Sequence, residues 1–298
     1  MTWNRVIADI ERFKFPKQPH YTVHDCFTDY SRERLIAKGK DCQRPWIGFN
    51  RFMEIVEPWS DVQKINEDQI ERHIEKRLQE KVTPLTIRRE LSFVKAAINY
   101  AHRRHRIGLA PYIELPDGVC KYRRPLTEEE FKLVIRQPMS ERLRRFYWVA
   151  YFTGHRAGAI EELTWARTSL ERRVIDFNVP GRRITNKRRA DDFPISDDFL
   201  RRLEAWKARA ADEFVIGAGP DTFREAQYVV RELAGLTDPS IVPRHCMRKK
   251  FASDLIAAGT SIEVVGHLTA DDPNTLRKHY VTHPPALLMG AVEKLGRA

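Results

Sequence analysis

The chain has 298 residues, of which 42% are hydrophobic and 31% charged, and its mean hydropathy is −0.53. This composition is typical of a globular protein with a packed core, and it excludes a disordered chain; no apolar run approaches the roughly 18 residues that a membrane span needs. The 52 lysines and arginines outnumber the 41 acids, so the net charge is +11 and the pI is near 9.6. Such a charge favours a polyanionic partner, nucleic acid first, although it also fits simple solubility or an anionic lipid surface.

Residues 1–20 are predicted to form an N-terminal extension without the apolar stretch of a signal peptide, so a cytoplasmic, nucleoid-associated protein is expected. The four cysteines contain no Cys-x-x-Cys pair, which indicates neither a zinc ribbon nor a redox motif and fits a reducing compartment. They are Cys26, Cys42, Cys120 and Cys246.

Residues 21–110 are predicted to form a helical domain. Asn66 and Gln69 form a capping box, and Thr83-Pro84 caps and starts a longer helix whose apolar residues recur at helical spacing from Ile87 to Ala101. The other faces of that helix carry cations that together could follow a DNA backbone, although each alone is more typical of a solvated helix face. These cations are Arg88, Arg89, Lys95, Arg103 and Arg104.

Residues 111–125 are rich in proline and are predicted to be a linker that ends in a basic run, in which Lys121, Arg123 and Arg124 are candidate DNA contacts. A capping box at Thr127 and Glu130 opens the second domain, residues 126–298. Apolar and polar residues alternate over 172–178, and a later strand is expected over 191–195. The remainder reads mainly helical, so the fold class is mainly α with a small sheet.

Several short motifs of the second domain carry reactive side chains. Arg156 follows a glycine at the end of an apolar helix, Lys187 lies between two expected strands, and His245 and Arg248 are three residues apart on one helix face. His267 follows Gly266, and Tyr280 comes late on a short helix that Asp272-Pro273 would start. Taken singly, each has an ordinary structural explanation, such as a helix cap, a solvated charge or a packing residue.

The six residues in this order, with these neighbours, resemble the catalytic signature of the tyrosine recombinase (phage integrase) family. The resemblance covers residues 126–298, and residues 83–106 are similar, more weakly, to the family's core-binding helical domain. It implies a helical, SAM-like core-binding domain at 21–110. It also implies a mostly α catalytic domain at 126–298 with a small three-stranded sheet.

The resemblance implies that Tyr280 attacks a DNA phosphodiester, forming a 3′-phosphotyrosyl link and freeing a 5′-hydroxyl. Arg156 and Arg248 would each fork onto the phosphate, and His245 and His267 would donate hydrogen bonds or move protons. Lys187 would be the acid for the leaving oxygen. These residue types suit phosphoryl transfer, because catalysis there is mostly positioning and stabilisation of negative charge.

The chemistry needs neither a metal nor a nucleotide cofactor, because side chains supply the cations and the covalent link conserves the bond energy. Pairs of histidines at helical spacing lack a third ligand, so no metal site is expected. The partners implied are double-stranded DNA, three further copies in a tetramer on DNA, and accessory DNA-bending or directionality proteins; no membrane is expected. An amphipathic segment at 286–295 fits packing on its own domain and on a neighbouring copy about equally well.

The sequence departs from the family pattern twice. Residues 268–274 form a small insertion between His267 and Tyr280, which puts the setting of His267 in question. The acidic residue usual three positions after the first arginine is replaced by Ala159, with Glu161 and Glu162 close by.

The leading hypothesis is a site-specific recombinase or integrase that moves a mobile element. Three alternatives stay open: a DNA-relaxing topoisomerase of related chemistry, a non-catalytic DNA-binding regulator with the same fold, and a basic helical protein with accidental motifs that binds RNA. Intact residues at all six positions argue against the regulator.

Overall fold

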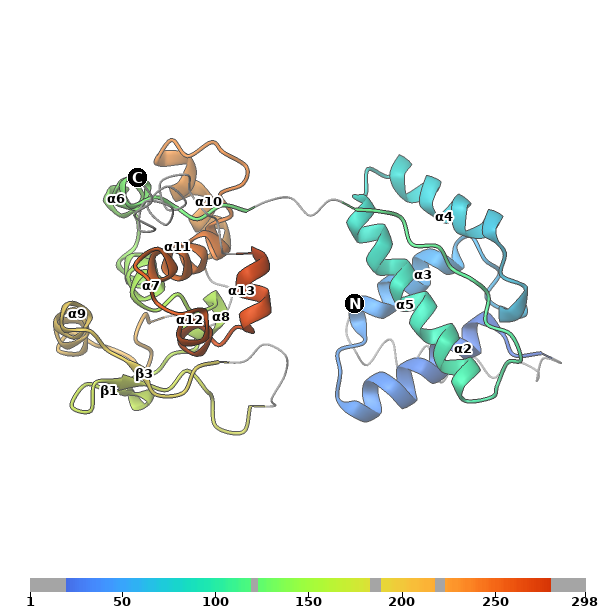
Figure 1. Cartoon of the computed structure of the whole chain (residues 1–298), viewed down its shortest axis with the longest axis horizontal. Coiled ribbons are helices and arrows are strands. Elements are labelled where there is room, and N and C mark those ends of the chain that lie inside the picture. The colour runs from blue at the N-terminus through green and yellow to red at the C-terminus, as the bar shows by residue number, and fades with distance from the viewer. Residues whose placement is uncertain (1–19, 119–122, 183–188, 218–222, 280–298) are drawn as a thin grey trace, which may run out of the picture. The chain divides into compact units, whose positions relative to one another are not determined.

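The computed structural model describes residues 20–118, 123–182, 189–217 and 223–279. The chain divides into two compact units, 1–120 and 121–298, each with its own hydrophobic core (Figure 1). The prediction of a mainly helical chain with a small three-stranded sheet is confirmed. Among the described residues, no helix has both the length and the apolar character that crossing a bilayer requires.

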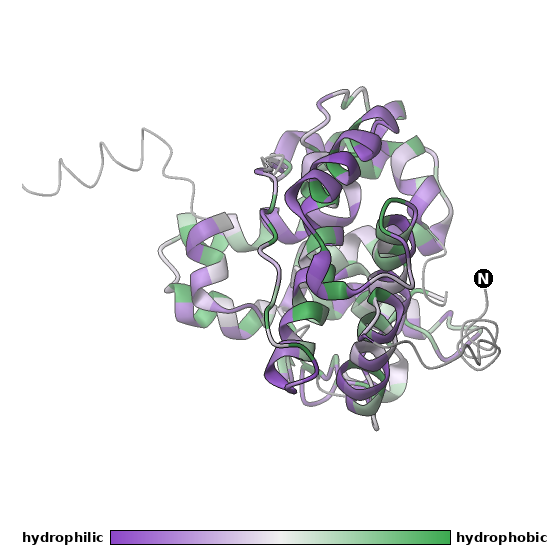
Figure 2. Ribbon diagram, turned by 90° about the vertical axis from the view of Figure 1, so that its right-hand side faces the viewer, coloured by the Kyte–Doolittle hydropathy of each residue, from purple (hydrophilic) through white to green (hydrophobic). Residues whose placement is uncertain are grey.

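The first unit is a helical bundle whose long central helix is α5 (Pro84–Arg103). Its core contains Phe27 stacked on Phe49, with ring centroids 4.1 Å apart, and the apolar stripe of α5 packs on the same core. Hydrophilic and hydrophobic residues alternate around individual helices, as amphipathic packing requires (Figure 2). Its elements are α2 (Val23–Asp29), the π-helical turn Tyr30–Leu35, the 3₁₀ turns Ile36–Lys38 and Val62–Lys64, α3 (Gln43–Met53), α4 (Glu67–Gln79) and α5 (Pro84–Arg103).

Local sequence sets two of these helix starts. The predicted capping box of Asn66 and Gln69 is present at the start of α4. Helix α5 begins at Pro84 as predicted, but the Thr83 side chain makes no capping hydrogen bond; its hydroxyl lies 3.1 Å from that of Thr86 instead. Proline at the first turn still favours the start, since its missing N–H would have no partner there.

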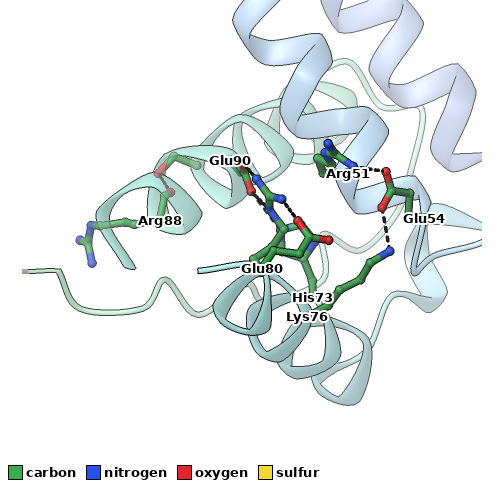
Figure 3. A network of polar contacts seen from close by, with 9 residues as sticks. Arg51, Glu54, His73, Lys76, Glu80, Arg88 and Glu90 are labelled. Atoms are coloured by element: carbon green, nitrogen blue, oxygen red, sulfur yellow. Dashed lines mark hydrogen bonds and ion pairs between the residues drawn. The ribbon is translucent and has the colours of Figure 1, made fainter. Parts of the chain in front are cut away.

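A buried ionic cluster joins α4 to α5. Arg77 donates to both carboxylate oxygens of Glu90, at 2.8 and 3.0 Å, and also bonds Glu80, while His73 lies 3.6 Å from Glu90 (Figure 3). At the rim, Glu54, the residue that follows α3, pairs with Lys76 of α4 at 2.7 Å. Because removing one member would leave an unpaired buried charge, the cluster holds these helices in one register.

The second unit places helices around a core that includes Tyr147 and Met247, with a sheet at one side. The sheet is antiparallel in the order β1-β2-β3, and each strand has only two residues. Its elements are α6 (Glu128–Arg136), α7 (Glu141–Thr153), α8 (Ala157–Glu161), the 3₁₀ turn Trp165–Arg167, β1 (Thr168–Ser169), β2 (Val174–Ile175), β3 (Phe193–Pro194), α9 (Asp197–Lys207), α10 (Arg224–Leu233), α11 (Pro243–Ala257), α12 (Ile262–Thr269) and α13 (Pro273–His279).

Helix α7 ends at Gly154, which adopts the left-handed conformation with φ of +60°. An added Cβ would lie 2.4 Å from the Phe251 ring, so the position excludes a side chain on two counts, backbone conformation and space. The turn at Gly154 directs the chain from α7 into α8.

We expect Gly154→Ala to lower the free energy of unfolding of the second unit by at least ~2 kcal/mol, since left-handed strain and overpacking each cost about 1–3 kcal/mol. Urea denaturation measures this free energy of unfolding, and hydrogen exchange of the α7 amides assigns the transition to the second unit. Gly158→Ala is the matched control, because a Cβ there meets nothing within 4 Å. Equal stability of the two variants would contradict the prediction.

Candidate active site

The first candidate arginine, Arg156, lies two residues after the turn that ends α7. Gly154 breaks the helix, and Arg156 takes an extended backbone conformation at the position preceding α8. Its side chain is 36% exposed. The backbone geometry of the Gly154 turn therefore fixes where Arg156 stands.

Helix α11 supplies the next two candidates. Pro243 opens the helix, and His245 and Arg248, three residues apart, lie on the same face. Both line a cavity of about 680 Å³ together with Arg156. The remaining lining residues are His155, Ala157, Gly158, Ala159, Glu162, Arg182, Arg189, Arg244, Asp271 and Thr275.

Arg248 is the most constrained cation of the cavity. Its side chain is 4% exposed, and every nitrogen of the guanidinium is engaged. Nη1 donates to the carbonyl of Gly154 at 2.9 Å, Nη2 to the carbonyl of Thr269 at 2.6 Å, and Nε to the carboxylate of Asp271 at 3.1 Å.

Asp271 joins the two arginines. Its Oδ1 accepts from Nη2 of Arg156 at 2.6 Å, while its Oδ2 lies 2.6 Å from Nη2 of Arg248. The carboxylate is only 5% exposed. The cavity therefore holds a single carboxylate between two guanidinium groups, which is the donor arrangement that binds a phosphate.

The two histidines of the cavity differ. His155 is buried and stacks on Phe177 with ring centroids 3.5 Å apart; burial, and then the charge of Arg248, lower its pKa to about 3, so it packs as a neutral ring. His245 keeps an exposed surface, yet partial desolvation of its ring and the surrounding cations, Arg123 first among them, lower its pKa. A neutral imidazole at pH 7 can accept a proton or donate a hydrogen bond.

The structure brings three of the six predicted residues together: Arg156, His245 and Arg248. His267 lies on α12, is exposed, and is not among the residues that line this cavity in the described part of the chain. Lys187 and Tyr280 lie outside the described residues. The last described helix, α13, ends at His279 and contributes Thr275 to the cavity wall.

Sequence reasoning missed four charged residues of the cavity. Arg244 pairs with Glu161 at 3.1 Å, Arg189 pairs with Glu162 at 2.7 Å, and Arg182 and Asp271 complete the set. Two features of the sequence could have pointed to these residues: the acids that follow Ala159, and the insertion after His267, which contains Asp271. In the structure these segments supply the carboxylates around the arginines.

No group of three or more His, Cys, Asp or Glu side chains is placed to hold a metal ion among the residues that the structure describes.

The candidate DNA contacts fall into two groups. Arg88 donates to the Pro116 carbonyl at 3.0 Å, Lys95 donates to the Ile113 carbonyl at 2.9 Å, and Arg124 bonds Glu130 and Asp238. These three side chains hold chain segments in place. The exposed group is Arg89, Arg103, Arg104 and Arg123, while Lys121 lies outside the described residues.

No protein-family model matches the sequence, and no curated protein matches it. Solved structures are similar to the chain as a whole. A Tn1549 transposon integrase in complex with transposon right-end DNA is 15% identical, with a TM-score of 0.71 over 93% of this chain and 100% of that chain. A lambda integrase dimer bound to a COC′ core site is 17% identical, with a TM-score of 0.69 over 89% and 96%. A lambda integrase tetramer bound to a Holliday junction is 16% identical, with a TM-score of 0.65 over 90% and 86%. The chain therefore has the fold of the tyrosine recombinases.

Proposed function

We propose that the chain is a site-specific DNA recombinase, which cleaves and rejoins DNA through a 3′-phosphotyrosyl intermediate on Tyr280. The observation that carries this proposal is the convergence of Arg156, His245 and Arg248 on one cavity, from segments that are far apart in the sequence. Their order and neighbours match the signature that suggested the family.

The cavity suits phosphoryl transfer. Two guanidinium groups facing one anion position can stabilise the charge that develops on the non-bridging oxygens of a phosphodiester. His245, whose pKa is lowered by desolvation and the surrounding cations, is a neutral imidazole at pH 7 and can accept a proton or donate a hydrogen bond. Lys187 is proposed as the acid for the leaving 5′-oxygen, and His267 as a further donor.

The proposed partner is double-stranded DNA, on which four copies assemble to integrate or excise a mobile element. The net charge of +11 supports a polyanionic partner. The similar solved structures are integrases bound to DNA, one of them a tetramer on a Holliday junction.

Suicide DNA substrates made from the flanks of the chain's own gene test the proposal. Such a substrate traps the covalent intermediate, and denaturing electrophoresis then shows a protein–DNA adduct. Supercoil relaxation without any strand exchange would favour a topoisomerase. Specific binding without an adduct would favour a regulator.

We expect Tyr280→Phe to abolish the adduct while DNA affinity stays within ~2-fold, less than about 0.5 kcal/mol, because only one hydroxyl is removed. The matched control is Tyr228→Phe, which removes a hydroxyl from α10. An adduct that persists in Tyr280→Phe and disappears in Tyr228→Phe would reassign the nucleophile.

We expect Arg156→Lys and Arg248→Lys each to lower the single-turnover cleavage rate by at least ~100-fold, the usual effect of losing one preorganised donor. Lysine keeps the charge but loses the fork geometry. Arg202→Lys, on α9 and stacked over Trp148, serves as the control. A rate within ~3-fold of that of the unaltered protein would show that this arginine is not part of the active site, because a ~3-fold change corresponds to under 1 kcal/mol of activation free energy.

The exposed cations of the first unit are expected to bind phosphates of the DNA backbone. Changing Arg89, Arg103 and Arg104 to alanine should flatten the slope of log affinity against log salt by roughly 0.9 for each phosphate that is no longer neutralised. The weakening should be equal for cognate and scrambled duplexes, because phosphates carry no sequence information. Arg72→Ala, an exposed arginine of α4, should leave the slope unchanged. Weakening confined to the cognate duplex would mean that these residues read bases.

A further inference from the structure

The Asp271 carboxylate lies between the guanidinium groups of Arg156 and Arg248, which are donors of the kind that bind phosphates. We infer that its carboxylate is an intramolecular inhibitor of the anion site, which the scissile phosphate must displace before both arginines can act. The inference deepens the proposed function and rests on it for the identity of the displacing phosphate.

Asp271 limits the donors that Arg248 can offer to a phosphate. Arg248 donates from Nη1 to the Gly154 carbonyl and from Nη2 to the Thr269 carbonyl, while its Nε and the second N–H of Nη2 face Asp271. Two parallel donors are needed for a bidentate bond to a phosphate. Those of Arg248 become available only when the carboxylate leaves.

The buried charge of Arg248 makes a carboxylate and a phosphate interchangeable in the cavity. Arg248 is almost fully buried, so it needs a counter-anion whether or not DNA is bound. A carboxylate and a phosphodiester each carry one negative charge, and guanidinium forks bind both. Exchange of Asp271 for a phosphate therefore leaves the charge of the cavity unchanged, which makes the two anions direct competitors.

Displacement of Asp271 also affects the helix that follows it. The residue lies between α12 and α13, and its backbone N–H donates to the Gly266 carbonyl at 3.0 Å. Helix α13 is anchored by Leu276 in a small cluster with Ala252 and Val265. A small buried anchor means a low cost of local opening. Displacing Asp271 therefore releases one of the main ties of α13, the helix that directly precedes Tyr280 in the sequence.

Asp271→Asn keeps the shape of the side chain and removes its charge, so it tests the competition directly. The probe is inorganic phosphate, titrated against the folded chain by calorimetry and thermal unfolding. We expect Asp271→Asn to bind phosphate at least ~10-fold more tightly than the unaltered protein, because the internal anion is gone. On suicide DNA, the single-turnover rate of cleavage at subsaturating DNA should rise at least ~5-fold.

Asp272→Asn is the matched control. It removes the same charge one residue away, and asparagine keeps the capping bond that Asp272 accepts from the Asn274 N–H at 2.9 Å. Both its phosphate affinity and its cleavage should stay unchanged. Unchanged phosphate affinity in Asp271→Asn, or cleavage slower than that of the unaltered protein, would overturn the inference, since Asp271 would then be a positioning residue for the arginines.

A second measurement needs no change at Asp271 and covers the case in which Asp271→Asn does not fold. Hydrogen exchange of residues 266–279 is followed in Tyr280→Phe with and without duplex DNA. Displacement predicts at least ~5-fold faster exchange at the Asp271 amide when DNA binds, because its bond to Gly266 is released. Unchanged or slower exchange would refute displacement.

The two proposals fail in different ways. If Asp271→Asn gains phosphate affinity but no variant forms an adduct with any DNA, the anion-site competition stands and the recombinase activity is refuted. If the unaltered protein forms the adduct and Asp271→Asn gains neither affinity nor rate, only the inhibitory role of Asp271 is refuted.

Discussion

A buried guanidinium needs a counter-charge, and this requirement organises the cavity of the second unit. Arg248 meets the carbonyl of Gly154, the carbonyl of Thr269 and the carboxylate of Asp271. These groups come from the end of α7, the end of α12 and the loop that follows it. A buried charge that loses its ion-pair or hydrogen-bond partners is strongly destabilising, so three segment ends are held around a single side chain. Arg156 is then placed as well, because it lies two residues beyond Gly154 and shares Asp271.

The parts of the molecule that the sequence predicted well depend on neighbours in the chain. The capping boxes at Asn66 and Thr127, and the left-handed glycine at the end of α7, are interactions within four residues, and all are present. The grouping of His245 with Arg248 follows from helical periodicity alone. Family resemblance added Arg156 to that pair, and the shared cavity agrees with it.

What the sequence could not predict depends on interactions between distant residues. Asp271 meets Arg156 across 115 positions, and the local pattern, which marks Asp272 as the cap of the next helix, gives Asp271 no role. Two-residue strands such as β1 have no measurable periodicity. A count of charges likewise treats all cations alike, although Lys95 and Arg124 hold the chain together while Arg89 and Arg103 face solvent. Only the fold separates the two groups.

The separation of the two cores has a consequence for biosynthesis. The residues of the first core all precede position 119, so that unit can fold while the second is still being made, on the order of ten seconds before the second is complete. The cavity of the second unit forms later, because its lining residues extend to Thr275. Arg156 and Arg248 leave the ribosome before Asp271, so the counter-charge that closes the site is made after both cations. While Asp271 is still inside the ribosome, the emerged chain therefore carries both arginines without this carboxylate, and emergence of the loop after α12 supplies their counter-charge.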